Sequence, residues 1–176
     1  MKLDDIFSDK TLKQKAKVEI ISTLVLDKNI SIAQLLSFAE KANDTEKATC
    51  IESLEFATKQ NAGIATEKWL KFVTASLANK APRVKWESAK VIGNIAHLFP
   101  TKLDKAIGNL LTNSENEGTV VRWAVAFALG EILKLNTKLN KELLPALEAI
   151  CNREEDNAIK KKYLDAIKKS LKSNKY

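Results

Sequence analysis

The residues best suited to chemistry are a base followed by a tryptophan, a pair that occurs twice at the same spacing. Lys85-Trp86 recurs as Arg122-Trp123 after 37 residues, and Lys160 takes the place of the base 38 residues further on. Each base falls in the first turn or so of an expected helix, where the positive end of the helix dipole disfavours a cation unless something offsets it. Such bases could combine with exposed helix N-termini to hold phosphate or carboxylate, so an anion-binding groove is one interpretation.

The two tryptophans lie one step off the expected apolar stripe of their helices, so we expect them on the same face of adjacent copies. A large aromatic side chain at an outward position can form a recognition patch, here together with Lys90, Phe127 and His97 on nearby faces. Alternatively, both rings cover the gap between neighbouring helices and serve as packing. The sequence leaves both interpretations of Trp86 and Trp123 open.

Motifs for catalysis and for metal binding are missing from the sequence. It contains no GxxxxGK[ST], GxSxG, HExxH or GxGxxG motif. His97 is the single histidine, and Cys50 and Cys151 are isolated, so neither a metal site nor a redox site is predicted. His97 is interpreted as a helix C-terminal residue, the cysteines as buried free thiols and Trp69 as a core residue. No cofactor and no catalytic residue is predicted, and we expect a non-enzymatic protein.

Composition favours helices joined by short turns. The 176 residues include 45% hydrophobic residues but only five Gly and three Pro. No apolar run approaches the roughly 18 to 20 residues of a membrane span, and the N-terminus lacks the apolar stretch of a signal peptide. A cytoplasmic protein without membrane contact is therefore predicted.

The net charge of +7 permits binding to an acidic protein or to nucleic acid. Only three of the 29 basic residues are arginine, the side chain that favours recognition of phosphates and bases. Lysines cluster at 160–162 and 168–175, where they are interpreted as a solvated end cap, with nucleic-acid contact as the alternative.

An internal repeat supplies the elements that would position these residues. Val84–Gly93 aligns with Val121–Gly130 at an offset of 37, and weaker copies flank this pair on both sides. Apolar residues recur at helical spacing in both halves of each copy, and Thr66 and Thr101 are expected to cap first helices. Hairpins of this size must stack to bury their apolar stripes, which predicts one α-solenoid domain over 1–176. The approximate hairpins are 3–28, 31–60, 65–99, 101–135 and 138–172.

The segment VRWAVAFALG at 121–130 resembles the second helix of HEAT repeats, including the short bacterial form similar to phycobilin-lyase-type repeats. That family reads Val-Arg-x-x-Ala-Ala-x-Ala-Leu-Gly, and VKWESAKVIG at 84–93 keeps the pattern with Lys for Arg. The resemblance implies an all-α, right-handed α-α superhelix of the ARM/HEAT type with about five hairpins. It also implies a ladder in which each base bonds to Asn79, Asn116 or Glu154, or to the adjacent loop.

Two functions are compatible with these features. The first is a protein- or peptide-binding scaffold that uses the face of the second helices, with the repeated tryptophans as anchors and an acidic partner bound by Lys85, Lys90 and Arg122. The second is a DNA-binding protein, because the chain also resembles HEAT-like alkylpurine DNA glycosylases in being a basic solenoid with tryptophans and bases on one face. That resemblance implies a carboxylate beside a tryptophan, and Glu87 is the nearest acid, although the chain lacks the family's doubled-Arg segment.

Overall fold

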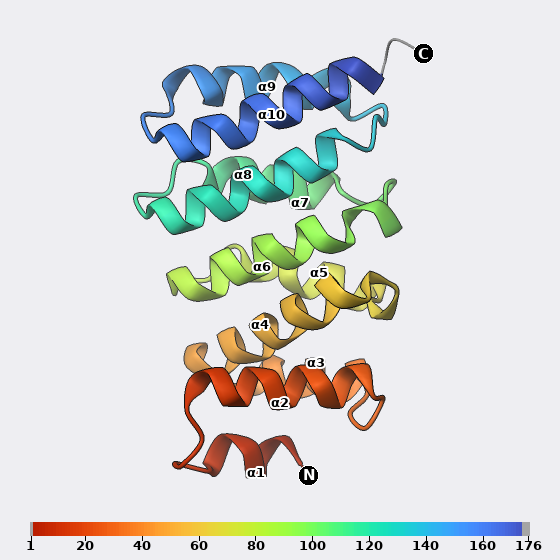
Figure 1. Ribbon diagram of the computed structural model, residues 1–176, viewed down its shortest axis with the longest axis vertical. Helices are drawn as coiled ribbons and strands as arrows, with labels where there is room; N and C mark the ends of the chain where they lie inside the picture. The colour runs from red at the N-terminus through yellow and green to blue at the C-terminus, as the bar shows by residue number, and fades with distance from the viewer. Residues whose placement is uncertain (1, 174–176) are drawn as a thin grey trace.

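The computed structural model describes residues 2–173, which form ten α-helices and two 3-10 helices without a β-strand (Figure 1). Each predicted hairpin range contains one consecutive pair of α-helices, except that α10 extends one residue further than predicted. The elements are α1 (Leu3–Ser8), α2 (Gln14–Leu26), α3 (Ile32–Lys41), α4 (Asp44–Gln60), η1 (Ala62–Ile64), α5 (Glu67–Ser76), α6 (Pro82–Ile95), η2 (Ala96–Leu98), α7 (Asp104–Asn113), α8 (Thr119–Leu133), α9 (Asn140–Arg153) and α10 (Asn157–Ser173).

The helical hairpins stack along one axis, with α1 at one end and the α9–α10 hairpin at the other (Figure 1). The second helices α2, α4, α6, α8 and α10 contact one another in sequence and form one layer of the stack. The first helices α3, α5, α7 and α9 lie behind them, and α1 lies at the N-terminal end. The predicted all-α solenoid is therefore confirmed.

The helix starts follow local sequence signals in most cases. Thr66 caps α5, because its hydroxyl accepts a hydrogen bond from the backbone N–H of Trp69 at 3.4 Å. Pro82 occupies the first turn of α6, as predicted. The predicted cap at Thr101 is wrong, since Lys102 N–H bonds to the Phe99 carbonyl and holds Thr101 in a turn before α7 begins.

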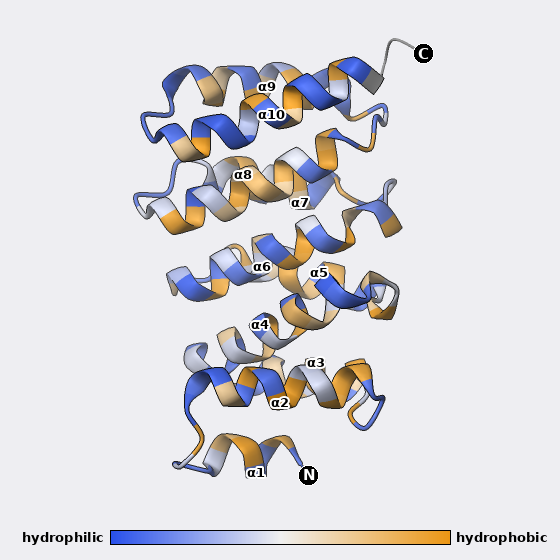
Figure 2. Ribbon diagram, in the orientation of Figure 1, coloured by the Kyte–Doolittle hydropathy of each residue, from blue (hydrophilic) through white to orange (hydrophobic). Residues whose placement is uncertain are grey.

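The core is continuous through the stack, because each hairpin buries its apolar stripe against the next. Trp69 is fully buried in it, and its indole N–H donates to the Ile32 carbonyl of the preceding hairpin at 3.2 Å. Cys50 and Cys151 are buried free thiols, as predicted. In the view of Figure 2, α8 carries long orange stretches whereas α10 is largely blue, so hydropathy falls sharply between the last two second helices.

Small residues allow the second helices to approach closely. A Cβ added at Gly130 of α8 would lie 3.0 Å from the Cβ of Ala166 in α10. This contact is tighter than ordinary van der Waals packing, so a side chain at position 130 would push the last two second helices apart. The Gly of the repeat motif thus sets the spacing of the layer that carries the candidate site.

Candidate binding groove between α8 and α10

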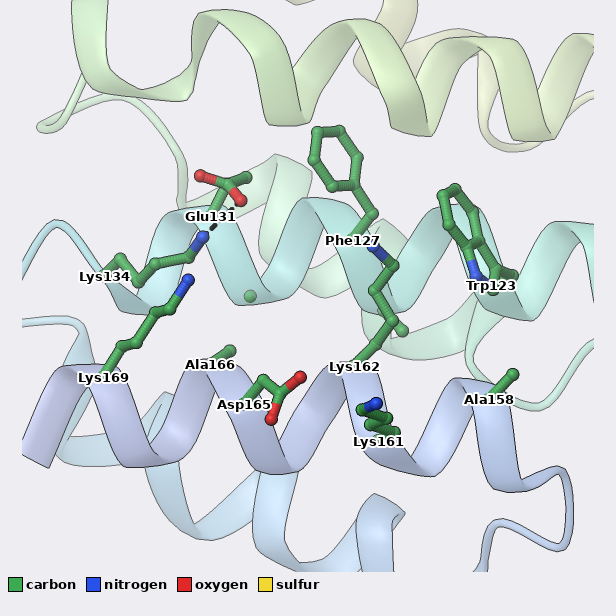
Figure 3. Close-up of a pocket in the computed structure, with 12 residues that line it drawn as sticks. Trp123, Phe127, Glu131, Lys134, Ala158, Lys161, Lys162, Asp165, Ala166 and Lys169 are labelled. Carbon is green, nitrogen blue, oxygen red and sulfur yellow. Dashed lines mark hydrogen bonds and ion pairs between the residues drawn. The ribbon is translucent and has the colours of Figure 1, made fainter.

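A groove of about 440 Å³ lies between α8 and α10 (Figure 3). Its volume falls in the range of sites that hold a few side chains or a small ligand. The lining from α8 is Trp123, Ala126, Phe127, Gly130 and Glu131, followed by Lys134. The lining from α10 is Ala158, Lys161, Lys162, Asp165, Ala166 and Lys169.

Two aromatic rings form the wall of the groove on α8. Trp123 and Phe127 are one helical turn apart, and their rings stack with centroids 6.4 Å apart and planes inclined by 16°. The Nζ of Lys162 crosses from α10 and lies 4.4 Å from the Trp123 ring centroid and 5.7 Å from that of Phe127 (Figure 3). This cation–π contact holds the two helices together across the groove while Trp123 stays 39% exposed.

The groove is positively charged. Four lysines line it against two carboxylates, those of Glu131 and Asp165. Glu131 forms an ion pair with Lys134, and Lys161 is exposed without an ion pair in residues 2–173. The groove therefore offers an aromatic surface beside an uncompensated cation, which suits a ligand with both apolar and anionic groups.

The bases at the start of α6 and α8 form a ladder between hairpins. The Nζ of Lys85 donates to the Asn113 side chain, at the end of α7, at 2.8 Å. Arg122 makes a two-pronged ion pair with Glu154, just after α9, at 3.0 and 3.2 Å. Its remaining nitrogen donates to the carbonyls of Asn116 and Glu117, so all three guanidinium nitrogens of Arg122 are bonded.

The ladder agrees with the expectation for Arg122, which bonds to the Asn116 and Glu117 carbonyls, but differs for Lys85 and Lys160. The expected acceptor of Lys160, Glu154, is bonded to Arg122 instead. Lys85 reaches forward to the following hairpin instead of back to Asn79, whose side chain is bonded to Asp44 and to the Ala81 N–H. The structure consequently does not gather the bases in one open anion groove. Lys85 and Arg122 join consecutive hairpins, and each offsets its unfavourable place in the helix dipole with an acceptor from the next one.

The Arg122–Glu154 contact changes the ionisation of both groups. Burial by itself raises the pKa of the Glu154 carboxyl, but the bonds from Arg122 and from the Asp156 N–H outweigh it, so this pKa lies below its ordinary value. The hydrogen bond to Glu154 likewise raises the pKa of Arg122 above its ordinary value, against a smaller effect of burial. Both groups are therefore charged at neutral pH, where the contact is an ion pair.

Trp86 and Lys90 belong to a second polar cluster, on α6. Trp86 is half-buried, and its indole N–H donates to the Glu87 carboxylate at 2.7 Å. Lys90 binds the same carboxylate at 2.9 Å and Glu55 of α4 at 3.5 Å. Burial raises the pKa of the Glu87 carboxyl, whereas for Lys90 the two carboxylates outweigh burial and raise the pKa of its ammonium. Trp86 and Trp123 thus hold equivalent positions in the repeat but different surroundings.

The remaining predicted residues lie apart from the groove. Lys160 is at the start of α10 and has no ion pair among the residues described. His97 is exposed in η2, at the end of the α6 segment as predicted. The basic stretch of α10 is split between the groove, with Lys161 and Lys162, and the outer surface, while 174–176 lie outside the described residues.

Sequence reasoning missed the part of the groove contributed by α10. It grouped Lys161 and Lys162 with the solvated end cap, although Lys162 touches both aromatic rings of α8. A signal was present, since Lys161 follows Trp123 at the same 38-residue step that relates Lys160 to Arg122. That step places the lysines beside the aromatic pair once α8 and α10 are neighbours.

Within residues 2–173, no helix has the combination of length and apolar character that crossing a membrane requires. The same residues contain no group of three or more His, Cys, Asp or Glu that could hold a metal ion.

Comparisons with known proteins identify the fold. No protein-family model matches the sequence, and a comparison with curated proteins finds no match either. The structure is similar to one in the complex of CpcE and CpcF of phycocyanin lyase from Nostoc sp. PCC7120, with a TM-score of 0.71 and 19% identity over 93% of this chain and 96% of that one. It is also similar to a designed armadillo repeat protein in complex with the peptide (KR)4, with a TM-score of 0.70 and 14% identity over 97% of this chain and 85% of that one. The chain is accordingly a HEAT/armadillo-like α-solenoid.

Proposed function

We propose that this solenoid is a non-enzymatic binding module that holds an acidic, partly apolar peptide segment of a partner protein in the groove between α8 and α10. The observation that carries the proposal is the stacked Trp123–Phe127 pair, which stays partly exposed beside the lysines of α10. Aromatic side chains that are rigidly held and partly exposed contribute strongly to protein recognition.

The charge of the groove favours an acidic ligand. Lys161 has no intramolecular ion pair among the residues described, and Lys162 is satisfied by aromatic faces instead of by a carboxylate. An aspartate or glutamate of the partner would complement these lysines, while an apolar side chain beside it would cover the exposed part of Trp123. In this arrangement the Phe127 ring stacks against the Trp123 ring, and Lys162 fixes the orientation of the Trp123 ring.

Both solved structures described above hold a protein or peptide partner, which supports a binding role. The designed armadillo repeat protein binds (KR)4, a basic peptide. This chain carries a net charge of +7, and its groove is basic, so the expected ligand has the opposite charge.

The test is the affinity for a short fluorescein-labelled peptide of aspartate and glutamate with one central leucine, measured by fluorescence anisotropy, with (KR)4 as the reverse-charge comparison. Trp123→Ala and Lys161→Glu should each weaken binding of the acidic peptide by about tenfold or more. Lys59→Glu is the matched control, because Lys59 is exposed on α4 away from the groove and makes the same change in net charge. Equal losses in Lys161→Glu and Lys59→Glu, or tighter binding of (KR)4, would contradict the proposal.

The same measurements examine the DNA-binding alternative. An oligonucleotide duplex that binds more tightly than the acidic peptide, with an affinity that falls steeply with salt, would favour nucleic acid over a peptide. The glycosylase form of this alternative finds no support in the α6 cluster, since the Glu87 carboxylate is buried and already bonded to Trp86 and Lys90. A base-release assay on alkylated duplex DNA is expected to show no product.

A further inference from the structure

The second helices α6 and α8 each carry a stripe that begins at the ladder base and continues four, seven and eleven residues later, positions that share one helical face. The stripe of α6 is Lys85, Ala89 and Ile92 and continues to Ala96 at the start of η2, and in α8 it is Arg122, Ala126, Leu129 and Leu133. Every apolar member of these two stripes is at most 1% exposed. The following hairpin packs against each of these helices and covers the stripe.

The same stripe is present on α10 but is only partly covered by residues 2–173, which bury Ile167 and leave both leucines exposed. It consists of Lys160, Leu164, Ile167 and Leu171, at the step of 38 residues from α8. Leu164 is 39% exposed and Leu171 is 45% exposed. A terminal repeat that only caps a solenoid carries a polar outer face, whereas these positions hold side chains as large as those of the buried stripe in α8.

The polar contacts that join consecutive hairpins are also incomplete at α10. Lys85 and Arg122 each bond to an acceptor at the end of the first helix of the following hairpin, namely Asn113 and Glu154. Lys160 occupies the same fourth position of its helix and has no such acceptor in the part of the chain that the structure describes. The outer face of α10 therefore carries the same apolar stripe and the same base that α6 and α8 use to contact the following hairpin, and here the base is unpaired.

From this correspondence we propose that the outer face of α10 docks a helical hairpin of an acidic partner protein, which stacks on the solenoid as a further repeat would. The partner supplies a carboxylate or carboxamide for Lys160 and an apolar helix face for Leu164 and Leu171. This surface is distinct from the groove between α8 and α10, because the stripe lies on the opposite side of α10 from Lys162 and Lys169.

The charge of α10 decides between an acidic partner and a second copy of this chain. The helix contains six lysines and one aspartate. Two copies joined through this face would bring the lysines of both helices together, which like-charge repulsion opposes. An acidic helical hairpin would instead be attracted to it, so the partner is expected to carry Asp and Glu on the helix that meets α10.

The test replaces residues 174–176 by a second copy of residues 136–173 placed directly after Ser173, which keeps the 38-residue step. Two extensions are compared, one with the natural lysines and one in which the lysines equivalent to Lys162 and Lys169 are glutamate. Thermal and urea unfolding then report whether the extension docks on α10. The acidic extension is expected to unfold together with the rest of the chain and to dock better than the basic one.

A leucine substitution makes the result specific to the stripe. In the acidic extended chain, Leu164→Asp should lower the folding equilibrium constant by roughly tenfold more than in the unextended chain, because Leu164 becomes buried only when a hairpin covers it. Leu98→Asp is the matched control, since Leu98 is 38% exposed in η2 and should respond equally in both chains. An extension that melts separately, or a Leu164→Asp effect of equal size in both chains, would overturn the docking face.

Two further outcomes would overturn the choice of an acidic partner. The first is a basic extension that docks as well as the acidic one. The second is a dimer of the natural chain in sedimentation velocity that Leu171→Asp dissolves, which would identify a second copy as the occupant. Peptide binding in the α8–α10 groove is expected to be unchanged in Leu164→Asp, so this proposal and the proposed function can fail independently.

Discussion

The ring of Phe127 lies directly over Gly93 of the preceding second helix, and a Cβ added at Gly93 would be 2.5 Å from the Cε1 atom of that ring. Gly93 is the last residue of the VKWESAKVIG motif, and Phe127 forms one wall of the candidate groove. Because Gly93 has no side chain, the Phe127 ring can pack against it, and stacking on this ring positions Trp123.

Gly93→Ala should destabilise the protein by about 1 to 3 kcal/mol, because the added methyl forces the Phe127 ring out of place. This loss opposes the gain of up to about 1 kcal/mol that alanine brings to a helix interior. Urea denaturation measures the effect, and the double variant Gly93→Ala/Phe127→Leu should recover most of it. A loss that the second substitution leaves unchanged would show that the contact with Phe127 is not its cause.

Arg122→Met should cost about 2 to 4 kcal/mol of unfolding free energy, because it leaves the buried Glu154 carboxylate without its partner. Lys85→Met is the matched comparison at the equivalent position. It should cost only about 1 kcal/mol, since Lys85 bonds to the neutral side chain of Asn113. Equal losses of unfolding free energy in the two variants would argue against a stronger contact between hairpins at Arg122 than at Lys85.

The Arg122–Glu154 contact should also make stability depend on pH in the acid range. The pKa of Glu154 is lowered from about 4.5, so the contribution of its carboxylate is complete above that pH and is lost as pH falls through the lowered pKa. Urea unfolding of the wild type and Glu154→Gln between neutral and acid pH should therefore show a stability difference that shrinks below about pH 4.5.

Glu87 provides a control of opposite sign for this pH dependence. Its pKa is raised, so stability associated with Glu87 is complete below about pH 4.5 and is lost as pH rises through the raised pKa. Glu87→Gln should accordingly gain stability relative to the wild type as pH rises out of the acid range. The same sign of pH dependence for both variants would contradict these assignments.

The three tryptophans should differ in their importance for stability. Trp69→Ala is expected to cost about 3 to 5 kcal/mol, because the ring is fully buried and bonded to Ile32. Trp123→Ala should cost about 1 kcal/mol or less, as expected for a partly exposed side chain. A large loss in Trp123→Ala would mean that this ring serves packing, and would weaken its assignment as a recognition residue.

The thiol of Cys50 should be unreactive in the native protein. Burial, followed by the nearby charge of Glu46, raises the pKa of this thiol to about 12, so almost no thiolate exists at pH 8. In a Cys151→Ser variant, a thiol-reactive disulfide reagent should modify Cys50 rapidly in denaturant and very slowly without it. Rapid modification under native conditions would reveal frequent local opening of α4.

The periodic apolar positions and the offset of 37 or 38 residues were sufficient to predict the hairpins and their stacking. These signals are local, because a helix needs only its own stripe and turn residues to specify where it begins, ends and faces the core. The cap at Thr101 failed for the same reason, since a turn between Phe99 and Lys102 competes with the capping motif in this short segment.

Only the tertiary structure decided which side chains meet across the hairpins. The bases at Lys85 and Arg122 were recognisable from the repeat, but their partners Asn113 and Glu154 lie 28 and 32 residues away along the chain. Trp123 and its counterpart Trp86 looked alike in sequence, yet Lys162 covers one and Glu87 binds the other. A repeat motif specifies the face of its own helix, whereas the rotation and shift between neighbouring hairpins determine which residues of the next hairpin lie opposite it.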